Sequence, residues 1–336
     1  MDARGGSPGA LTIAAFAMAV TLGSGNFIAV RFSNRQLPPF WGAGLRFGLA
    51  ALLMVVVALA LRLVWPRGRL LAYTVAYGLF GFAAFYALMY WALVRVTAGT
   101  ATIVMAIVPL MTLLLAVMQG YERLHPRAAL GALLALAGIA WMALGPGRGD
   151  IPVGALVAMV GASVCAAQSL ILGKRISANH PATTNAVGMT VGTVVLLAIS
   201  AALGESWTIP VGAEALWAIA YLVTFGSIGL FALMLLVVRR WTASASSYAF
   251  VLFPVVTLAL GAWLADEPVT GRAIVGAVLV MLGVWFGALS PGARRTAAAA
   301  TTGAPTGTAA GPTAAATAAP AAGVDAVPVP APTPPC

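Results

Sequence analysis

A few polar and aromatic side chains lie within long apolar segments of this sequence, where they could contact a ligand. Arg46 is the one basic residue inside such a segment, and burying an ionisable group there is expensive unless it serves a function. Arg46 could bind a carboxylate or a phosphate. The alternative is a structural role, in which it braces its helix or extends its charged end to the polar surface. Asn26 and Gln168 could line the same cavity, or each could hydrogen-bond a neighbouring helix.

Aromatic residues form a second set of candidates. Tyr86 and Tyr90 are four residues apart and therefore share one face of a helix. This face could hold an amphiphilic ligand by stacking, or it could anchor the helix at the membrane surface. Ser247 and Tyr248 open a later segment and could meet the same cavity.

The acidic residues and histidines argue against several kinds of chemistry. The two histidines, His125 and His180, both lie between apolar segments, and the eight acids lie at segment ends, in connections or in the terminal regions. A membrane enzyme would need clustered His, Asp or Ser near one interface, and ATP-driven transport would need a glycine-rich phosphate loop. The sequence therefore predicts no catalytic residues, no metal site and no cofactor.

Composition indicates a membrane protein. Of the 336 residues, 61% are hydrophobic and 8% are charged, whereas soluble domains carry about 25% charged residues. The net charge of +10 does not indicate nucleic-acid binding, because the basic residues occur singly or in pairs between apolar runs. They instead resemble the topology signals of a chain whose partner is the lipid bilayer.

Ten apolar runs are long enough to cross a bilayer, which takes about 20 residues each. We expect an all-α integral membrane protein whose spans cover residues 10–30, 40–62, 71–93, 98–119, 127–144, 153–173, 184–203, 214–238, 244–264 and 271–289. With the N-terminus inside, twelve basic residues face the cytoplasm and five face the other side. This bias predicts a multi-pass protein of the cell (inner) membrane with both termini cytoplasmic.

The second half of the chain repeats the first in register, 145 positions later. The matched pairs include Pro109 with Pro254, Glu122 with Glu267, Gly131 with Gly276, and Gly138 with Gly283. Each repeat holds five spans, an odd number, so the second copy enters the membrane from the opposite side. Inverted repeats with a substrate site between the halves are typical of secondary transporters. The alternatives are a non-transporting membrane scaffold and a membrane-embedded enzyme.

The repeat predicts four regions: a cytoplasmic N-terminus at 1–9, five-helix repeats at 10–144 and 152–289, and a disordered Ala/Pro/Thr-rich tail at 290–336. Pro109 and Pro254 fall near the middle of their spans, where they could form paired gating kinks beside a wet cavity or static bends. Glu122 and Glu267 lie at span ends. Each is expected to act as a turn clasp that bonds its turn or pairs with a nearby arginine.

Small residues line one face of the fifth and tenth spans, at Gly131, Gly138, Gly276 and Gly283. Such faces let helix backbones approach closely within a membrane. We expect packing within one molecule, with a homodimer seam as the alternative.

The sequence resembles the EamA-like type of the drug/metabolite transporter superfamily. The resemblance covers about residues 10–289 and rests on the motifs Gly23–Phe27, Leu45–Phe47, Ile107–Leu110, Glu122–Leu124, Leu252–Pro254 and Asp266–Pro268. It implies ten helices in two inverted repeats, and the export or exchange of small metabolites, amino acids or drugs. The chain departs from the family at Leu22, where tryptophan is common. Val191 stands opposite Arg46 in the repeat, so the arginine is not duplicated.

Reporter fusions test the orientation. A reporter that is active only in the cytoplasm should be active when it is fused after Arg67 or after Arg239. A periplasmic signal at these positions would overturn the predicted topology.

Overall fold

The structure is a computed structural model that describes residues 10–120, 126–144, 152–241 and 246–286. The predicted N-terminal segment 1–9, Glu122 and the tail at 290–336 lie outside the described residues. The first half contains α1 (Ala10–Asn34), α2 (Pro39–Ala60), α3 (Gly68–Gly78), η1 (Leu79–Ala84), α4 (Phe85–Leu93), α5 (Ala98–Met105), α6 (Val108–Met118) and α7 (Pro126–Leu144).

The second half repeats this order. It contains α8 (Val153–Arg175), α9 (Pro181–Ala202), α10 (Ala213–Val223), η2 (Thr224–Gly229), α11 (Leu230–Arg240), α13 (Ala249–Leu264) and α14 (Gly271–Val284). Seven helical segments of the described chain are long and apolar enough to cross a membrane, and three shorter apolar helices accompany them. The predicted all-α membrane fold of ten spans is confirmed.

The third and eighth spans each contain one π-helical turn. These turns, η1 (Leu79–Ala84) and η2 (Thr224–Gly229), are 145 residues apart and so occupy the same place in each repeat. A π-turn shifts the backbone hydrogen bonds from i+4 to i+5 and is frequent at functional sites. The internal repeat therefore extends to a backbone irregularity that apolar periodicity does not predict.

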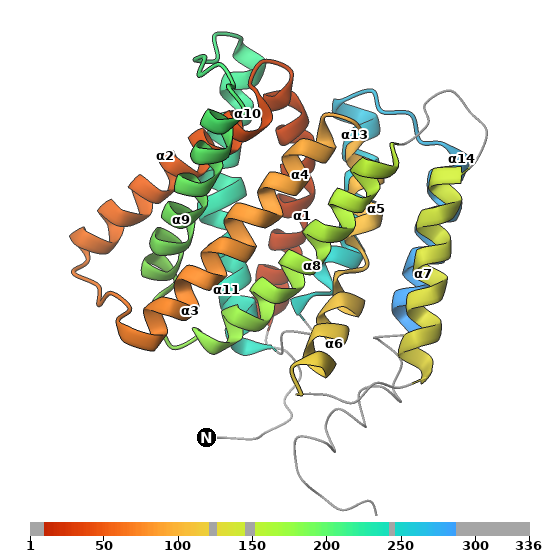
Figure 1. The fold of residues 1–336 in the computed structure, drawn as a ribbon, viewed down its shortest axis with the longest axis horizontal. Coiled ribbons are helices and arrows are strands. Elements are labelled where there is room, and N and C mark those ends of the chain that lie inside the picture. The colour runs from red at the N-terminus through yellow and green to blue at the C-terminus, as the bar shows by residue number, and fades with distance from the viewer. Residues whose placement is uncertain (1–9, 121–125, 145–151, 242–245, 287–336) are drawn as a thin grey trace, which may run out of the picture. The chain divides into compact units, whose positions relative to one another are not determined.

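Helix packing follows the inverted repeat. The second span of each half packs against its own copy, α2 against α9, and the fifth spans do the same, α7 against α14 (Figure 1). The first span of each half packs into the other half: α1 contacts α10, α11 and α13, while α8 contacts α3, α4, α5 and α6. Because each half inserts its first helix into the other, the space at the centre is bounded by both.

The glycine faces of the fifth and tenth spans are used within the molecule. A Cβ atom built on Gly283 would lie 2.5 Å from the carbonyl oxygen of Gly131 and 2.6 Å from the amide nitrogen of Ala135. A Cβ built on Gly138 would lie 3.0 Å from the carbonyl oxygen of Gly276. Absent side chains thus let the backbones of α7 and α14 touch, and the described contacts of these faces give no support to the homodimer seam.

The two mid-span prolines lie in different local structures. Pro109 lies in the first turn of α6, directly after the fourth span breaks at Ala106 and Ile107. The first turn of a helix tolerates proline because the missing N–H would have no partner there. Pro254 lies inside α13, which remains one helix from Ala249 to Leu264.

Substitution of the glycines tests the close packing of α7 against α14. We expect Gly283→Ala to lower the free energy of unfolding by about 1–3 kcal/mol, because the added methyl group overlaps with backbone atoms that cannot move aside easily. Thermal unfolding in detergent measures this loss. Gly271→Ala is the matched control on α14, since nothing lies within 4 Å of its added Cβ. Equal melting temperatures for both variants would contradict the packing.

Candidate functional site

A cavity lies between the two halves and encloses about 800 Å³ of empty space, counting the part that opens outward. Its walls come from α1, from the third span, and from α8, α11 and α13. The lining residues are Gly23, Asn26, Phe27, Tyr77, Gly81, Phe85, Tyr86, Met89, Ala166, Ser169, Leu170, Gly173, Leu230, Phe231, Met234, Leu235, Val238, Phe250 and Phe253. The surface is mainly apolar and aromatic, which is the usual character of a small-molecule site.

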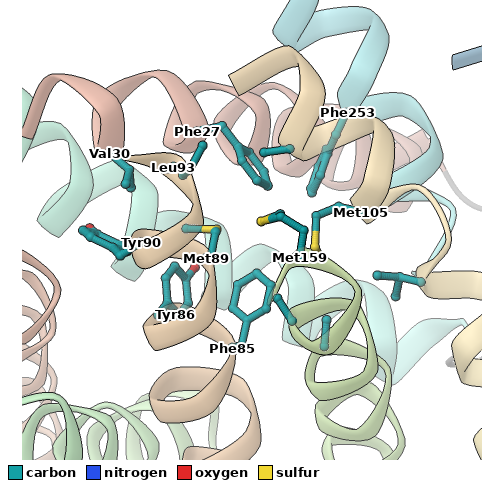
Figure 2. Packing of buried hydrophobic residues seen from close by; sticks show 14 of the residues in the cluster. Phe27, Val30, Phe85, Tyr86, Met89, Tyr90, Leu93, Met105, Met159 and Phe253 are labelled. Carbon is teal, nitrogen blue, oxygen red and sulfur yellow. The ribbon is translucent and has the colours of Figure 1, made fainter. Parts of the chain in front are cut away.

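Aromatic rings shape the cavity. Phe27 of α1 lies beside Phe253 of α13, with ring centroids 6.0 Å apart, while Phe85 lies 4.6 Å from Tyr86 on α4 (Figure 2). Gly23 allows the Phe253 ring to approach α1, because a Cβ at this position would lie 2.6 Å from the ring. Aromatic pairs of this kind bury large areas in defined geometries.

Arg46 lies directly behind this wall and has no solvent-exposed surface. Its guanidinium group donates from Nε to Ser227 Oγ and from Nη2 to the carbonyl oxygen of Gly226, each at 2.8 Å. The same group lies 4.9 Å from the ring centroid of Tyr86, which lines the cavity. Among the described residues Arg46 has no carboxylate partner. Its positive charge is therefore stabilised by neutral dipoles and ring faces alone.

The π-turn η2 supplies the acceptors for this arginine. The carbonyl oxygen of Gly226 also accepts a hydrogen bond from Asn26 Nδ2 at 3.0 Å, and Ser227 Oγ donates to the carbonyl oxygen of Leu222 at 2.7 Å. Glycine is required at 226 because a Cβ there would overlap with the Asn26 amide. Asn26 Oδ1 has no hydrogen-bond partner within the described structure, although Asn26 is only 3% exposed. This oxygen is packed against Gly226 of η2 and has almost no accessible surface.

The structure brings four of the sequence-predicted site residues together. Asn26 and Tyr86 line the cavity, Arg46 lies behind them, and Arg46 Nη1 lies 3.5 Å from the Tyr90 hydroxyl oxygen. Tyr90 itself is fully buried outside the cavity lining.

The other three candidates do not line the cavity. Gln168 Oε1 accepts a hydrogen bond from Gln119 Nε2 at 2.8 Å. Ser247 is buried and Tyr248 is partly buried just before α13.

Sequence reasoning missed several lining residues. Tyr77 lies nine positions before Tyr86 on the same span, and no spacing rule marks it. Phe253 was noted only as part of the motif before Pro254. The sequence does not mark Ser169 or Phe231 as lining residues, because their helices are apolar on every face and the face toward the cavity cannot be identified.

Carboxylates of the second half bind helix termini of the first half at one end of the bundle. Glu267 Oε1 accepts from Arg31 Nη1 at 2.7 Å and from the Ala98 amide at 3.1 Å, while Oε2 accepts from the Gly99 amide at 3.3 Å. Glu267 thus caps the N-terminus of α5, where the helix dipole favours a negative charge. The Glu267 side chain is 10% exposed. We call this arrangement of Arg31, Glu267 and the α5 amides the clasp.

A second carboxylate works in the same way at this end. Glu205 accepts from the amides of Phe40 at 3.3 Å and Trp41 at 2.7 Å, and so caps the N-terminus of α2. Glu214 pairs with Arg35 nearby. The sequence around Glu205 does not predict this capping role, because the helix that it caps lies in the other half of the chain.

At the opposite end, a lysine binds backbone carbonyl oxygens at the end of α11. Lys174 Nζ donates to the carbonyl oxygens of Val238 and Trp241, both at 3.0 Å. The cavity-lining residues Tyr77, Gly173 and Val238 belong to helix segments near this end. The cavity therefore extends from the end that carries the N-terminus of α1 to Phe27, which lies about one helical turn before Arg31 of the clasp.

Comparisons with known proteins agree with this architecture. Residues 10–144 and 153–288 each match the EamA-like transporter family. The inner membrane transporter YedA of Escherichia coli K12 is 31% identical over 81% of this chain and 91% of its own length. A probable terminal-alkyne amino-acid exporter of Streptantibioticus cattleyicolor is 29% identical over 71% of this chain and 80% of its own. One solved crystal structure, at 23% identity, covers 85% of this chain and 98% of its own with a TM-score of 0.59, and it supports the fold alone.

The clasp generates a stability prediction. Glu267→Ala removes the acceptor of Arg31 and of two α5 amides, so we expect the free energy of unfolding to fall by about 1–3 kcal/mol. Glu214→Ala is the control, because its pair with Arg35 is about half exposed on both sides and such pairs contribute about 0–1 kcal/mol. Thermal unfolding in detergent compares the two variants, and a larger loss for Glu214→Ala would be evidence against the clasp.

Proposed function

This chain belongs to the EamA-like transporter family, and from that premise we propose that it carries carboxylate-bearing small organic molecules across the cell membrane by alternating access. The observation that carries the proposal is the cavity that both repeats line. A site between inverted repeats can be exposed to either side when the two halves exchange conformations. A membrane scaffold has no need of such a cavity.

The lining supports an organic substrate with an apolar body. Phe27, Phe85, Phe231 and Phe253 offer ring faces and edges to an apolar group. A strongly hydrated inorganic ion would lose its water shell there with few polar groups to replace it.

The charge of the site supports an anion or a zwitterion over a cation. The lining contains no acidic residue among the described parts of the chain, and Arg46 lies behind Tyr86 without a carboxylate partner among them. In a medium of low dielectric constant this charge stabilises a nearby carboxylate and repels a cation. The printed name of one relative, an amino-acid exporter, agrees with a zwitterionic substrate.

The positions of the clasp and the cavity suggest which state the structure represents. With both termini in the cytoplasm, the clasp lies at the outer face and the cavity extends to the cytoplasmic end. This is the arrangement of a transporter that loads substrate from inside the cell, as an exporter does. Opening the outer face requires Glu267 to release Arg31 and the α5 amides. The break before Pro109 and the π-turns η1 and η2 are the proposed places where the backbone adjusts.

The cavity belongs to a single chain, so we propose the monomer as the transport unit. The alternative functions considered from the sequence, a scaffold and a membrane enzyme, gain no support from the described residues. We retain the roles expected from the sequence. Glu122 is proposed as a turn clasp, and Pro109 and Pro254 are proposed as gating positions.

Counterflow in proteoliposomes tests the proposal. We expect wild-type protein to exchange L-phenylalanine and to exclude phenethylamine, which has the same ring and ammonium group but no carboxylate. Arg46→Gln should slow phenylalanine exchange about 10- to 100-fold, since the loss of a positive charge about 6–10 Å from the carboxylate, at an effective dielectric constant of about 20, costs about 1.5–3 kcal/mol. Asn26→Asp should shift the preference toward the amine by placing a negative charge in the cavity.

Arg95→Gln is the matched control. Arg95 stacks on Trp91, with its guanidinium carbon 3.8 Å from the ring centroid, and does not line the cavity. Its exchange rate should equal that of the wild type. Failure of folded wild-type protein to exchange any amino acid would refute the proposed substrate class.

A further inference from the structure

Tyr77 is a polar residue of the cavity lining that plays no part in the charge effect of Arg46. It belongs to α3 and lines the cavity, and its residue surface is only 6% exposed. Its hydroxyl forms no hydrogen bond with any of the described residues, whereas the Tyr90 hydroxyl lies beside Arg46 and the Tyr221 hydroxyl donates to the Leu22 carbonyl oxygen. The Tyr77 hydroxyl oxygen keeps some accessible surface and borders the cavity, where it can hydrogen-bond water or a ligand.

Three glycines from three helical segments lie beside the Tyr77 ring. A Cβ built on Gly188 of α9 would lie 3.3 Å from the ring, one on Gly173 of α8 would lie 3.7 Å away, and one on Gly81 of η1 would lie 3.9 Å away. Phe82 packs its ring edge to face against Tyr77, with centroids 5.6 Å apart. The ring therefore packs against Phe82 and lies close to the backbone of three helical segments, which limits its movement. A hydroxyl on a ring of limited movement needs little ordering when it binds a ligand.

The place of Tyr77 along its span separates it from the charged pole of the cavity. Tyr86 lies nine residues further along, which corresponds to about 13 Å of helix. Tyr86, Asn26 and the Arg46 charge form one pole, and Tyr77 stands at the other, near Gly173 and Val238. The surface between the poles is apolar, with Phe85 and Phe231 on it.

We propose that Tyr77 determines specificity by hydrogen-bonding a polar group at the distal end of the substrate, the end opposite its carboxylate. This inference rests on the proposed function and narrows its substrate class to carboxylates whose apolar body ends in a hydroxyl or a similar group. A site built to hydrogen-bond a hydroxyl binds the analogue that lacks it less tightly, because its own polar group then loses that partner.

Two pairs of probes that differ by one hydroxyl test the inference: L-tyrosine with L-phenylalanine, and 5-hydroxy-L-tryptophan with L-tryptophan. Half-saturation concentrations for counterflow are measured for each probe. The wild type should prefer the hydroxylated member of at least one pair by about 3- to 10-fold, the range expected for one net hydrogen bond. Tyr77→Phe should reduce this preference to nearly one by weakening only the hydroxylated member.

Tyr73→Phe is the matched control, since Tyr73 lies one turn earlier on α3, stacks with Arg175 and does not line the cavity. It should keep the wild-type preference. Equal melting temperatures show that the variants are folded. If wild-type protein exchanges amino acids but Tyr77→Phe leaves the ratio unchanged, the role of Tyr77 is refuted while the proposed function stands. If the wild type exchanges none of the four probes, both fail.

Discussion

The buried guanidinium group of Arg46 is the interaction on which the centre of this protein depends. A charge in the middle of a membrane protein needs compensation, and no carboxylate of the described chain provides it. The compensation comes from a backbone irregularity: the π-turn η2 presents the Gly226 carbonyl oxygen to both Arg46 and Asn26. One short segment of the second half thereby joins two helices of the first. The wall of the cavity and the electrostatic potential within it both follow from this arrangement.

The two halves share a fold but differ in the polar side chains that surround their π-turns. Both contain a π-turn at the same repeat position, yet only η2 meets an arginine, because Val191 stands where the repeat would place a second one. Around η1 the contacts are steric: Gly78 packs on Gly188, and Gly81 packs on Ser169. Under the proposed mechanism, a symmetric backbone would let the halves exchange conformations, while the asymmetric side chains would give a substrate one orientation in the cavity. In this proposal the repeated backbone serves the movement of the halves, and the side chains that differ between them serve substrate recognition.

Charged groups elsewhere are confined to the ends of the bundle, where they act on helix termini. Glu267 and Glu205 each accept hydrogen bonds from the first amides of a helix in the opposite half. A carboxylate at a helix N-terminus satisfies donors that have no partner within the helix and complements the helix dipole. Such contacts are strong enough to close one end, yet they involve few residues and can be exchanged for water. In the proposed mechanism, this combination would suit a gate better than a wide apolar seam such as the one between α7 and α14.

The sequence by itself determined the membrane class, the ten spans and the inverted repeat, because apolar run length and a fixed offset are local properties of the chain. It also marked Arg46, Asn26 and Tyr86, since polar groups are conspicuous in apolar helices. Only the tertiary structure decided which helix faces meet. It excluded Gln168, Ser247 and Tyr248 from the cavity lining, added Tyr77 and Phe253, and revealed the partners of Arg46 on η2. The physical reason is that membrane helices are apolar on every side. Hydrophobic periodicity, which identifies the buried face of a soluble helix, therefore carries little information here, and the packing of small residues and backbone irregularities selects the faces instead.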